Sequence, residues 1–291
     1  MFLQTIVNGL LMGGVYGLAT VGFSVVWGVM GIINLAHGAY VMIGAYVAYV
    51  LNQWLGLDPF LAMAAAMPVL FVIGYVLQVT LLNPVMRTSL LLTLVVTFGL
   101  DLILVDTFVQ IFSSDVRGVQ TAYSGRSLAL GPVLVPYVRL AAAVLSIVVA
   151  TAAFLFLNRT RTGQAILATA LDREAARLMG IVPERIYGLT GGLSAAVTGA
   201  AGCLASTLFP ISPTLGLTFL GAVFVITVLG GIGSVPGVIL AGFAYALVQA
   251  FASTYLGANY QEIVAFSMFL VVLIVRPQGL FGKRFYGEAS A

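Results

Sequence analysis

Apolar residues dominate the chain in nine long runs, separated by polar or proline-marked breaks. The runs cover about residues 5–30, 37–53, 60–82, 89–111, 137–157, 186–208, 216–234, 237–256 and 261–276. A helix that crosses the hydrocarbon core of a bilayer needs about 20 predominantly apolar residues. The pattern therefore predicts an all-α, polytopic integral membrane protein with eight to nine transmembrane helices. The second and last runs are short, and one of them is a candidate half-helix.

Composition excludes several classes of protein. Of the 291 residues, 61% are hydrophobic and only 7% are charged, whereas a soluble domain carries about 25% charged residues. A soluble enzyme, a disordered chain and a nucleic-acid binder are therefore excluded, and a net charge of +3 is no nucleic-acid footprint. The single cysteine, Cys203, rules out an intrachain disulfide or a multi-cysteine metal site. The chain also has only one histidine, so it lacks a credible site for an intramembrane enzyme. The lipid bilayer is the first expected partner.

Basic residues are distributed unevenly between the breaks. Nine of the 12 arginines and lysines fall in residues 83–88, residues 158–186 and the C-terminal tail, and three fall in or beside the loop 112–136. Because cytoplasmic loops carry the excess of basic residues, the first group is predicted to be cytoplasmic and the loop 112–136 to be outside. Nine spans then leave the C-terminus cytoplasmic and the N-terminus outside. The first basic residue is Arg87, so a signal peptide with a basic leading region is not expected.

A weak internal repeat relates the two halves of the chain. A shift of 178 positions aligns Gly13 and Gly14 with Gly191 and Gly192, and Gly38 with Gly216. In both copies a Gly/Ala-rich helix runs into an irregular polar stretch, at residues 33–38 and 210–216, and another apolar helix follows. An odd number of spans separates the copies, so the repeat would be inverted, as in many transporters. Chance matches among 33 glycines are the alternative.

Polar residues in the two irregular stretches are candidates for a substrate pathway. The first stretch and the following helical turn contain Asn34, His37 and Tyr40, and the second stretch contains Ser212 and Thr214. The His37 ring could hydrogen-bond backbone groups freed where the helix is interrupted, contact the polar end of a substrate, or relay a proton. Uncharged groups of this kind suit a solute that is apolar at one end and zwitterionic at the other.

The predicted cytoplasmic segment contains a clear signal for a short helix. Asp172 is positioned to cap it, Gly180 to end it and Pro183 to prevent its continuation. Arg173 and Arg177 are four residues apart on one face. Another face consists of Leu171, Ala175, Leu178 and Met179. Eight residues are too few for a helix that is stable alone, so it must dock either on lipid headgroups or on a cytoplasmic partner.

Several segments match a known family in both sequence and order. They read GVMGIINLAHG (28–38), IGAY (43–46), VLGGIGSVPG (228–237) and RPQGLFG (276–282). The spacing from Ala176 to Gly180 is similar to that in the coupling loop of ABC importer permeases. Over most of its length the chain resembles the H-type subunit of the Liv-type branched-chain amino acid permeases. Ala39 stands where many relatives have an acidic residue, which leaves open the amino acid carried, or whether a urea- or amide-type solute replaces it.

The resemblance implies a permease subunit of an ATP-driven importer in the bacterial cytoplasmic membrane, with the whole chain forming one transmembrane domain. Its implied partners are a second permease subunit, identical or paralogous, two cytoplasmic ATPase subunits and a periplasmic or extracellular binding protein. ATP and Mg would bind at the ATPases, and this chain would bind no cofactor. The sequence also lacks a Gly-x-x-x-x-Gly-Lys-Ser/Thr phosphate loop. The residues expected to couple to the ATPases are Asp172, Arg173, Glu174, Arg177, Leu178 and Gly180.

A self-contained secondary transporter or channel is the rival hypothesis. Asp101 lies about 12 residues into its apolar run, and carboxylates inside a membrane are rare and usually functional. A secondary transporter, however, needs no protruding cytoplasmic docking helix. The predicted helix at residues 172–179 therefore favours the ATP-driven importer.

Overall fold

A computed structural model describes residues 1–86, 88–121 and 123–275, and most of them form helices, as predicted. The N-terminal helices are α1 (Phe2–Met30), α2 (His37–Leu55), α3 (Pro59–Leu77), η1 (Gln78–Leu82), α4 (Asn83–Met86) and α5 (Leu90–Phe112). A small hairpin follows, made of β1 (Ser127–Leu130) and β2 (Val133–Pro136). The remaining helices are α6 (Tyr137–Arg159), α7 (Arg161–Leu171), α8 (Arg173–Leu178), α9 (Pro183–Ala205), α10 (Leu215–Gly230), α11 (Val235–Tyr255), η2 (Ala258–Tyr260) and α12 (Gln261–Val275).

Each of the nine predicted apolar runs overlaps a helix of the structure. Within the described residues, seven helical segments are long and apolar enough to cross a membrane, and α2 is not among them. The apolar helix α10 has 16 residues, so it is about 24 Å long, shorter than a hydrocarbon core of about 30 Å. An all-α fold with multiple membrane spans is therefore confirmed, while the count of eight to nine spans stays a prediction.

Local sequence signals explain where several helices begin and end. The Asp58 carboxylate accepts a hydrogen bond from the backbone N–H of Phe60 (2.9 Å) at the start of α3, with Pro59 in the first turn. The side chain of Ser234 likewise accepts from Gly237 (3.2 Å) at the start of α11. Gly31 ends α1 with a φ of 69°, a left-handed conformation that residues with a Cβ rarely adopt.

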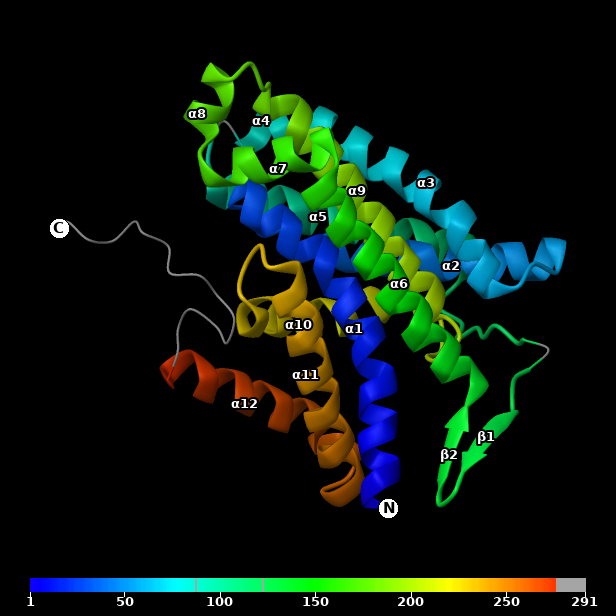
Figure 1. Ribbon diagram of the computed structural model, residues 1–291. Helices are drawn as coiled ribbons and strands as arrows, with labels where there is room; N and C mark the ends of the chain where they lie inside the picture. The colour runs from blue at the N-terminus through cyan, green and yellow to red at the C-terminus, as the bar shows by residue number, and fades with distance from the viewer. Residues whose placement is uncertain (87, 122, 276–291) are drawn as a thin grey trace.

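Helices α1 and α9 form the centre of the bundle, and most of each is buried by the other helices. Helix α1 lies along α11, α9 lies along α3, and α1 and α9 also pack against each other (Figure 1). Glycines permit these close approaches. A Cβ on Gly44 of α2 would overlap the carbonyl oxygen of Gly199 on α9, and a Cβ on Gly202 would overlap that of Val41. Small residues at such interfaces let helix backbones approach closely in membranes.

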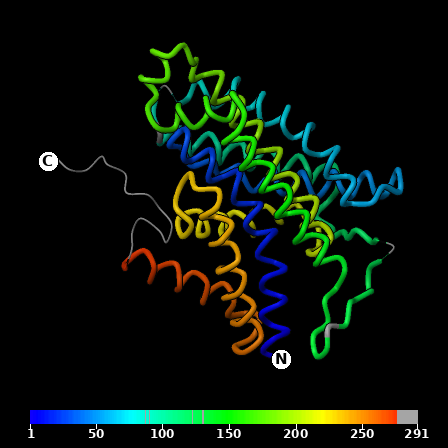
Figure 2. Tube along the Cα trace, in the orientation of Figure 1, coloured from blue at the N-terminus to red at the C-terminus, as the bar shows by residue number. Residues whose placement is uncertain are grey.

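The two ends of the bundle differ. Figures 1 and 2 show the N-terminus and the hairpin β1–β2 at one end and α4, α7 and α8 at the opposite end. The Gln4 side chain ties α1 to the hairpin, because it donates to the carbonyl oxygen of Leu134 and accepts from its N–H, both at 2.8 Å. The N-terminus and the loop 112–136, both predicted to be outside, therefore lie on the same side. The loop 158–186 lies on the other side.

Some elements were not predicted from the sequence. The hairpin β1–β2 pairs antiparallel within the loop 112–136, and the 11-residue helix α7 fills the start of the segment 158–186. The predicted cytoplasmic tail, with Arg276, Lys283, Arg284 and the segment 276–282, lies outside the described residues. Arg87, which contributed to the predicted orientation, lies outside them as well.

Candidate functional sites

The first irregular stretch joins α1 to α2 and is held by polar contacts. The Asn34 side-chain oxygen accepts from the backbone N–H of Ala36 (3.0 Å), and the N–H of His37 donates to the carbonyl oxygen of Asn34 (3.2 Å). The N–H of Leu35 donates to the Thr97 hydroxyl of α5 (3.2 Å). Backbone groups that leave the helical ladder are thus satisfied within the protein, as a membrane environment requires.

His37 lies at the start of α2 and is completely buried. Its Nε2 is 2.9 Å from the carbonyl oxygen of Ala19 on α1 and 3.2 Å from the Thr198 hydroxyl on α9. The ring therefore connects three helices at the centre of the bundle. Asn34 and Tyr40 are buried as well, so all three candidates of the first stretch lie inside the chain in this conformation.

The second irregular stretch joins α9 to α10 and is more accessible. Ser212 is half-buried and Thr214 is exposed, and their hydroxyl oxygens are 3.0 Å apart. Ile211 pairs with Arg117 of the loop 112–136 through two backbone hydrogen bonds of 2.8 Å. The Arg117 guanidinium donates to the Tyr49 hydroxyl (2.8 Å) and to the carbonyl oxygen of Phe112 (2.7 Å). The loop 112–136 and the second stretch are therefore joined.

The two stretches meet where their following helices begin. A Cβ on Gly38 would overlap the carbonyl oxygen of Gly216, and a Cβ on Gly216 would lie 2.6 Å from the carbonyl oxygen of Gly38. These are the two glycines that the repeat alignment pairs. The first turns of α2 and α10 are thus in direct backbone contact, which brings the two groups of candidate pathway residues to neighbouring places.

The predicted cytoplasmic helix is present as α8. The Asp172 carboxylate accepts from the backbone N–H groups of Glu174 (2.9 Å) and Ala175 (3.0 Å), as expected of an N-cap. Gly180 follows the helix with a φ of 81°, and Pro183 begins α9. The Arg177 guanidinium donates to Glu174 (3.1 Å) and to Glu184 of α9 (3.0 Å), so the helix is fixed against the start of α9.

Apolar side chains in and beside α8 form an apolar face that the described residues do not cover. Leu171 at the end of α7, Leu178 in α8 and Met179 directly after it are 89%, 89% and 83% exposed, whereas Ala176 of α8 is buried. Large apolar side chains exposed together are uncommon on a protein surface outside binding sites or lipid contacts. The helix therefore presents its apolar side chains outward, at the end of the bundle that carries α7.

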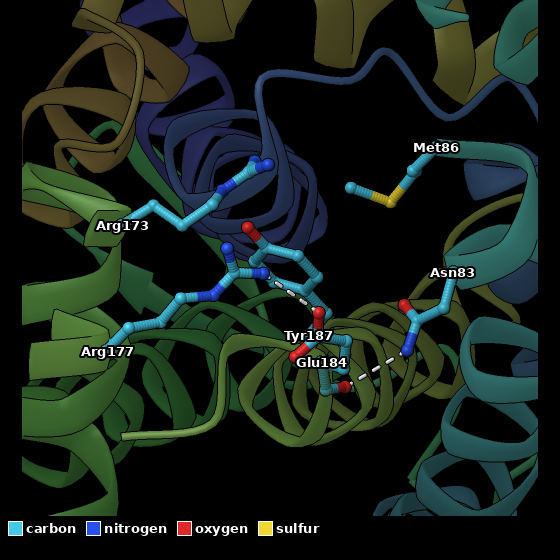
Figure 3. Close-up of a pocket in the computed structure, with 6 residues that line it drawn as sticks. All are labelled: Asn83, Met86, Arg173, Arg177, Glu184 and Tyr187. Atoms are coloured by element: carbon cyan, nitrogen blue, oxygen red, sulfur yellow. Dashed lines mark hydrogen bonds and ion pairs between the residues drawn. The ribbon is translucent and has the colours of Figure 1, made fainter. Parts of the chain in front are cut away.

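A cavity of about 390 Å³ lies behind α8, between α8, α4 and the first turns of α9. Its lining residues are Asn83, Met86, Arg173, Arg177, Glu184 and Tyr187 (Figure 3). Asn83 accepts from Gln78 (3.0 Å) and donates to the carbonyl oxygen of Glu184 (3.0 Å). Sequence reasoning identified the two arginines but missed Asn83, Glu184 and Tyr187, because their proximity to α8 depends on packing between distant segments.

Comparisons with known proteins agree on one family. Residues 5–273 match the family described as the permease component of branched-chain amino acid transport systems. The chain is 32% identical to the high-affinity branched-chain amino acid transport system permease protein BraD of Pseudomonas aeruginosa, over 97% of this chain and 96% of BraD. It is 31% identical to LivH of Escherichia coli, with the same coverage.

A longer relative and one solved structure also match. LivM of Escherichia coli is 30% identical over 91% of this chain and 67% of LivM. The structure of PsaBC from Streptococcus pneumoniae in complex with Fab covers 93% of this chain at 16% identity, with a TM-score of 0.46.

Proposed function

The chain belongs to the family of branched-chain amino acid transport permeases, and we propose that it moves leucine, isoleucine and valine inward by alternating access in a complex with ATPase subunits. It is a permease component rather than a catalytic subunit. BraD and LivH, which align with nearly its full length, are named as high-affinity branched-chain amino acid permease proteins. ATP and Mg would bind to the partner ATPases.

The exposed apolar face of α8 is the observation that carries the coupling role. A short helix that is capped and fixed on one side, yet exposes Leu171, Leu178 and Met179 on the other, is suited to docking on a cytoplasmic ATPase. In this proposal Asp172 and Gly180 define the ends of the helix. Arg173, Glu174 and Arg177 set its charge. ATP-driven closure of two ATPases would then move the α8 helices of two permease subunits together.

An external binding protein would deliver the amino acid to the opposite end. The pairing of Arg117 with Ile211 joins the outer loop to the second irregular stretch, and this joint surface supports docking there. In this proposal the N-terminus and the hairpin lie outside, and α8 lies in the cytoplasm of a bacterial cell. A second permease subunit, which we propose to be a paralogue, would complete the pathway.

The pathway is proposed to follow the contact between the first turns of α2 and α10. Ser212 and Thr214 lie at its accessible edge, and Asn34, His37 and Tyr40 lie behind it. A route that uses the buried group requires α2 and α10 to separate during the transport cycle. The repeat alignment pairs α1 with α9 and α3 with α11, so the contact of α1 with α11 is equivalent to that of α9 with α3. These contacts support an inverted repeat, which would allow the two halves to rock about the contact between α2 and α10.

Reversing charge on α8 tests the proposed coupling. Arg177→Glu would lose both ion pairs and repel Glu174 and Glu184, so we expect ATPase co-purification and leucine uptake to fall together. Arg161→Glu, at the start of α7, makes the same charge change outside the α8 surface and is the control. Normal co-purification and uptake in Arg177→Glu would refute the coupling role of α8.

A further inference from the structure

One polar group of the cavity behind α8, the Tyr187 hydroxyl, has no partner among the described residues. Tyr187 is only 6% exposed, and within the described residues its hydroxyl has no hydrogen-bond partner. Leaving such a buried group unpaired is energetically unfavourable. The hydroxyl turns toward the cavity, on the side where the guanidinium groups of Arg173 and Arg177 lie (Figure 3). A ligand with several acceptor oxygens would satisfy it once the side chains that bury this oxygen move aside.

The charge of the cavity favours an anion. Arg173 lies over the Tyr187 ring, with its guanidinium carbon 5.2 Å from the ring centroid. In the part of the chain that the structure describes, Arg173 forms no ion pair, whereas Arg177 is bonded to Glu174 and Glu184. A guanidinium presents a planar fork of N–H donors that matches the oxygens of phosphate. Arg173 and the Tyr187 hydroxyl together therefore fit a phosphate group.

A second, apolar hollow adjoins this cavity. It measures about 420 Å³, is lined by Val79, Asn83, Pro84 and Glu184, and shares Asn83 and Glu184 with the first cavity. From there a stripe of exposed valines runs from η1 along α3 toward the middle of the bundle. Its members are Val69, Val72, Val76 and Val79.

The length of this stripe matches one leaflet of a bilayer. Ten residues separate Val69 from Val79, which is about 15 Å along a helix, and the hydrocarbon core is about 30 Å thick. An apolar stripe of this length that ends in a basic cavity fits an amphiphile with an acyl chain and an anionic head. An acidic side chain of a partner protein would use the cavity but not the stripe.

We propose that the cavity binds the phosphate headgroup of an anionic phospholipid from the cytoplasmic leaflet, with an acyl chain along the valine stripe of α3. Basic pockets at the cytoplasmic ends of membrane helices suit such headgroups. The lipid would fill the space behind α8 and brace the helix on the face opposite its exposed leucines. The inference rests on the cytoplasmic orientation of α8 proposed above.

Native mass spectrometry of the assembled transporter in detergent tests the proposal. Phosphatidylglycerol, phosphatidylcholine and inorganic phosphate would be added in separate arms. We expect phosphatidylglycerol to bind the wild type in preference to phosphatidylcholine, and inorganic phosphate at equal concentration not to displace it. Arg173→Gln and Tyr187→Phe should each weaken phosphatidylglycerol binding about fivefold, which corresponds to about 1 kcal/mol.

Arg161→Gln is the matched control, since Arg161 is exposed at the same end of the bundle but does not line the cavity. Equal binding of phosphatidylcholine, displacement by inorganic phosphate, or equal effects of Arg173→Gln and Arg161→Gln would overturn the proposal. Unchanged lipid binding with loss of the ATPases in Arg173→Gln would assign the cavity to an acidic partner side chain instead. This experiment measures lipid binding and not leucine uptake. A failure of the lipid proposal can therefore be told apart from a failure of the proposed transport function.

Discussion

Replacing Leu178 with alanine isolates the apolar contribution of α8 to ATPase docking. The side chain is 89% exposed in this chain, so its removal should change the free energy of unfolding by no more than about 0.5 kcal/mol. Burial of a leucine side chain against a partner stabilises the complex by about 1.5–3 kcal/mol. At 1.4 kcal/mol for each factor of ten, Leu178→Ala should weaken ATPase binding roughly 10- to 100-fold.

The assay is a titration of purified ATPase subunits against the permease in nanodiscs, with thermal unfolding measured in parallel. Leu134→Ala is the matched control, because Leu134 is 56% exposed on the hairpin at the opposite end of the bundle. The control should bind the ATPases normally. Wild-type affinity in Leu178→Ala would refute the argument that the exposed face of α8 is the docking surface.

Three further predictions test the cap, the helix contacts and the pathway. Asp172→Ala should lower ATPase affinity by about 1 kcal/mol through loss of the N-cap, measured in the same titration, and Asp172→Asn should retain most of it. Gly44→Ala should lower the unfolding temperature because the added Cβ overlaps α9. Gly99→Ala is the control and should not lower it, because Gly99 has open space around it. Equal effects of the two variants would refute the close contact. In a cysteine-free background, Thr214→Cys should react with a polar thiol reagent at rest, and Asn34→Cys only during ATP turnover; equal labelling at rest would contradict the buried position of Asn34.

Hydrophobic patterning predicted the helices well because each membrane span must bury or expose a long apolar surface and satisfy its own backbone. The ends of α8 were also predictable, because Asp172 and Gly180 act on backbone groups next to them in the sequence. Turn and cap chemistry is local, so it is readable from a few consecutive residues. The bounds of α8 were therefore predictable to within one or two residues.

Contacts between distant segments were not predictable in this way. The burial of His37 depends on Ala19 and Thr198, which lie on two other helices. The cavity behind α8 depends on Tyr187 and Asn83, which no local pattern links to Arg173. The hairpin in the outer loop was missed because its strands are only four residues long and follow no extended alternation. Packing, rather than local propensity, determines each of these features.

Uptake of radiolabelled leucine into proteoliposomes tests whether the protein is the permease subunit of an ATP-driven importer of branched-chain amino acids. The complete transporter, with its binding protein present and ATP on the cytoplasmic side, should accumulate leucine, isoleucine and valine, and omission of either ATP or the ATPases should abolish uptake. Sugars and metal chelates should not enter under the same conditions. Leucine uptake by the permease alone under an ion gradient, or transport of a sugar or metal complex without leucine uptake, would contradict the assignment.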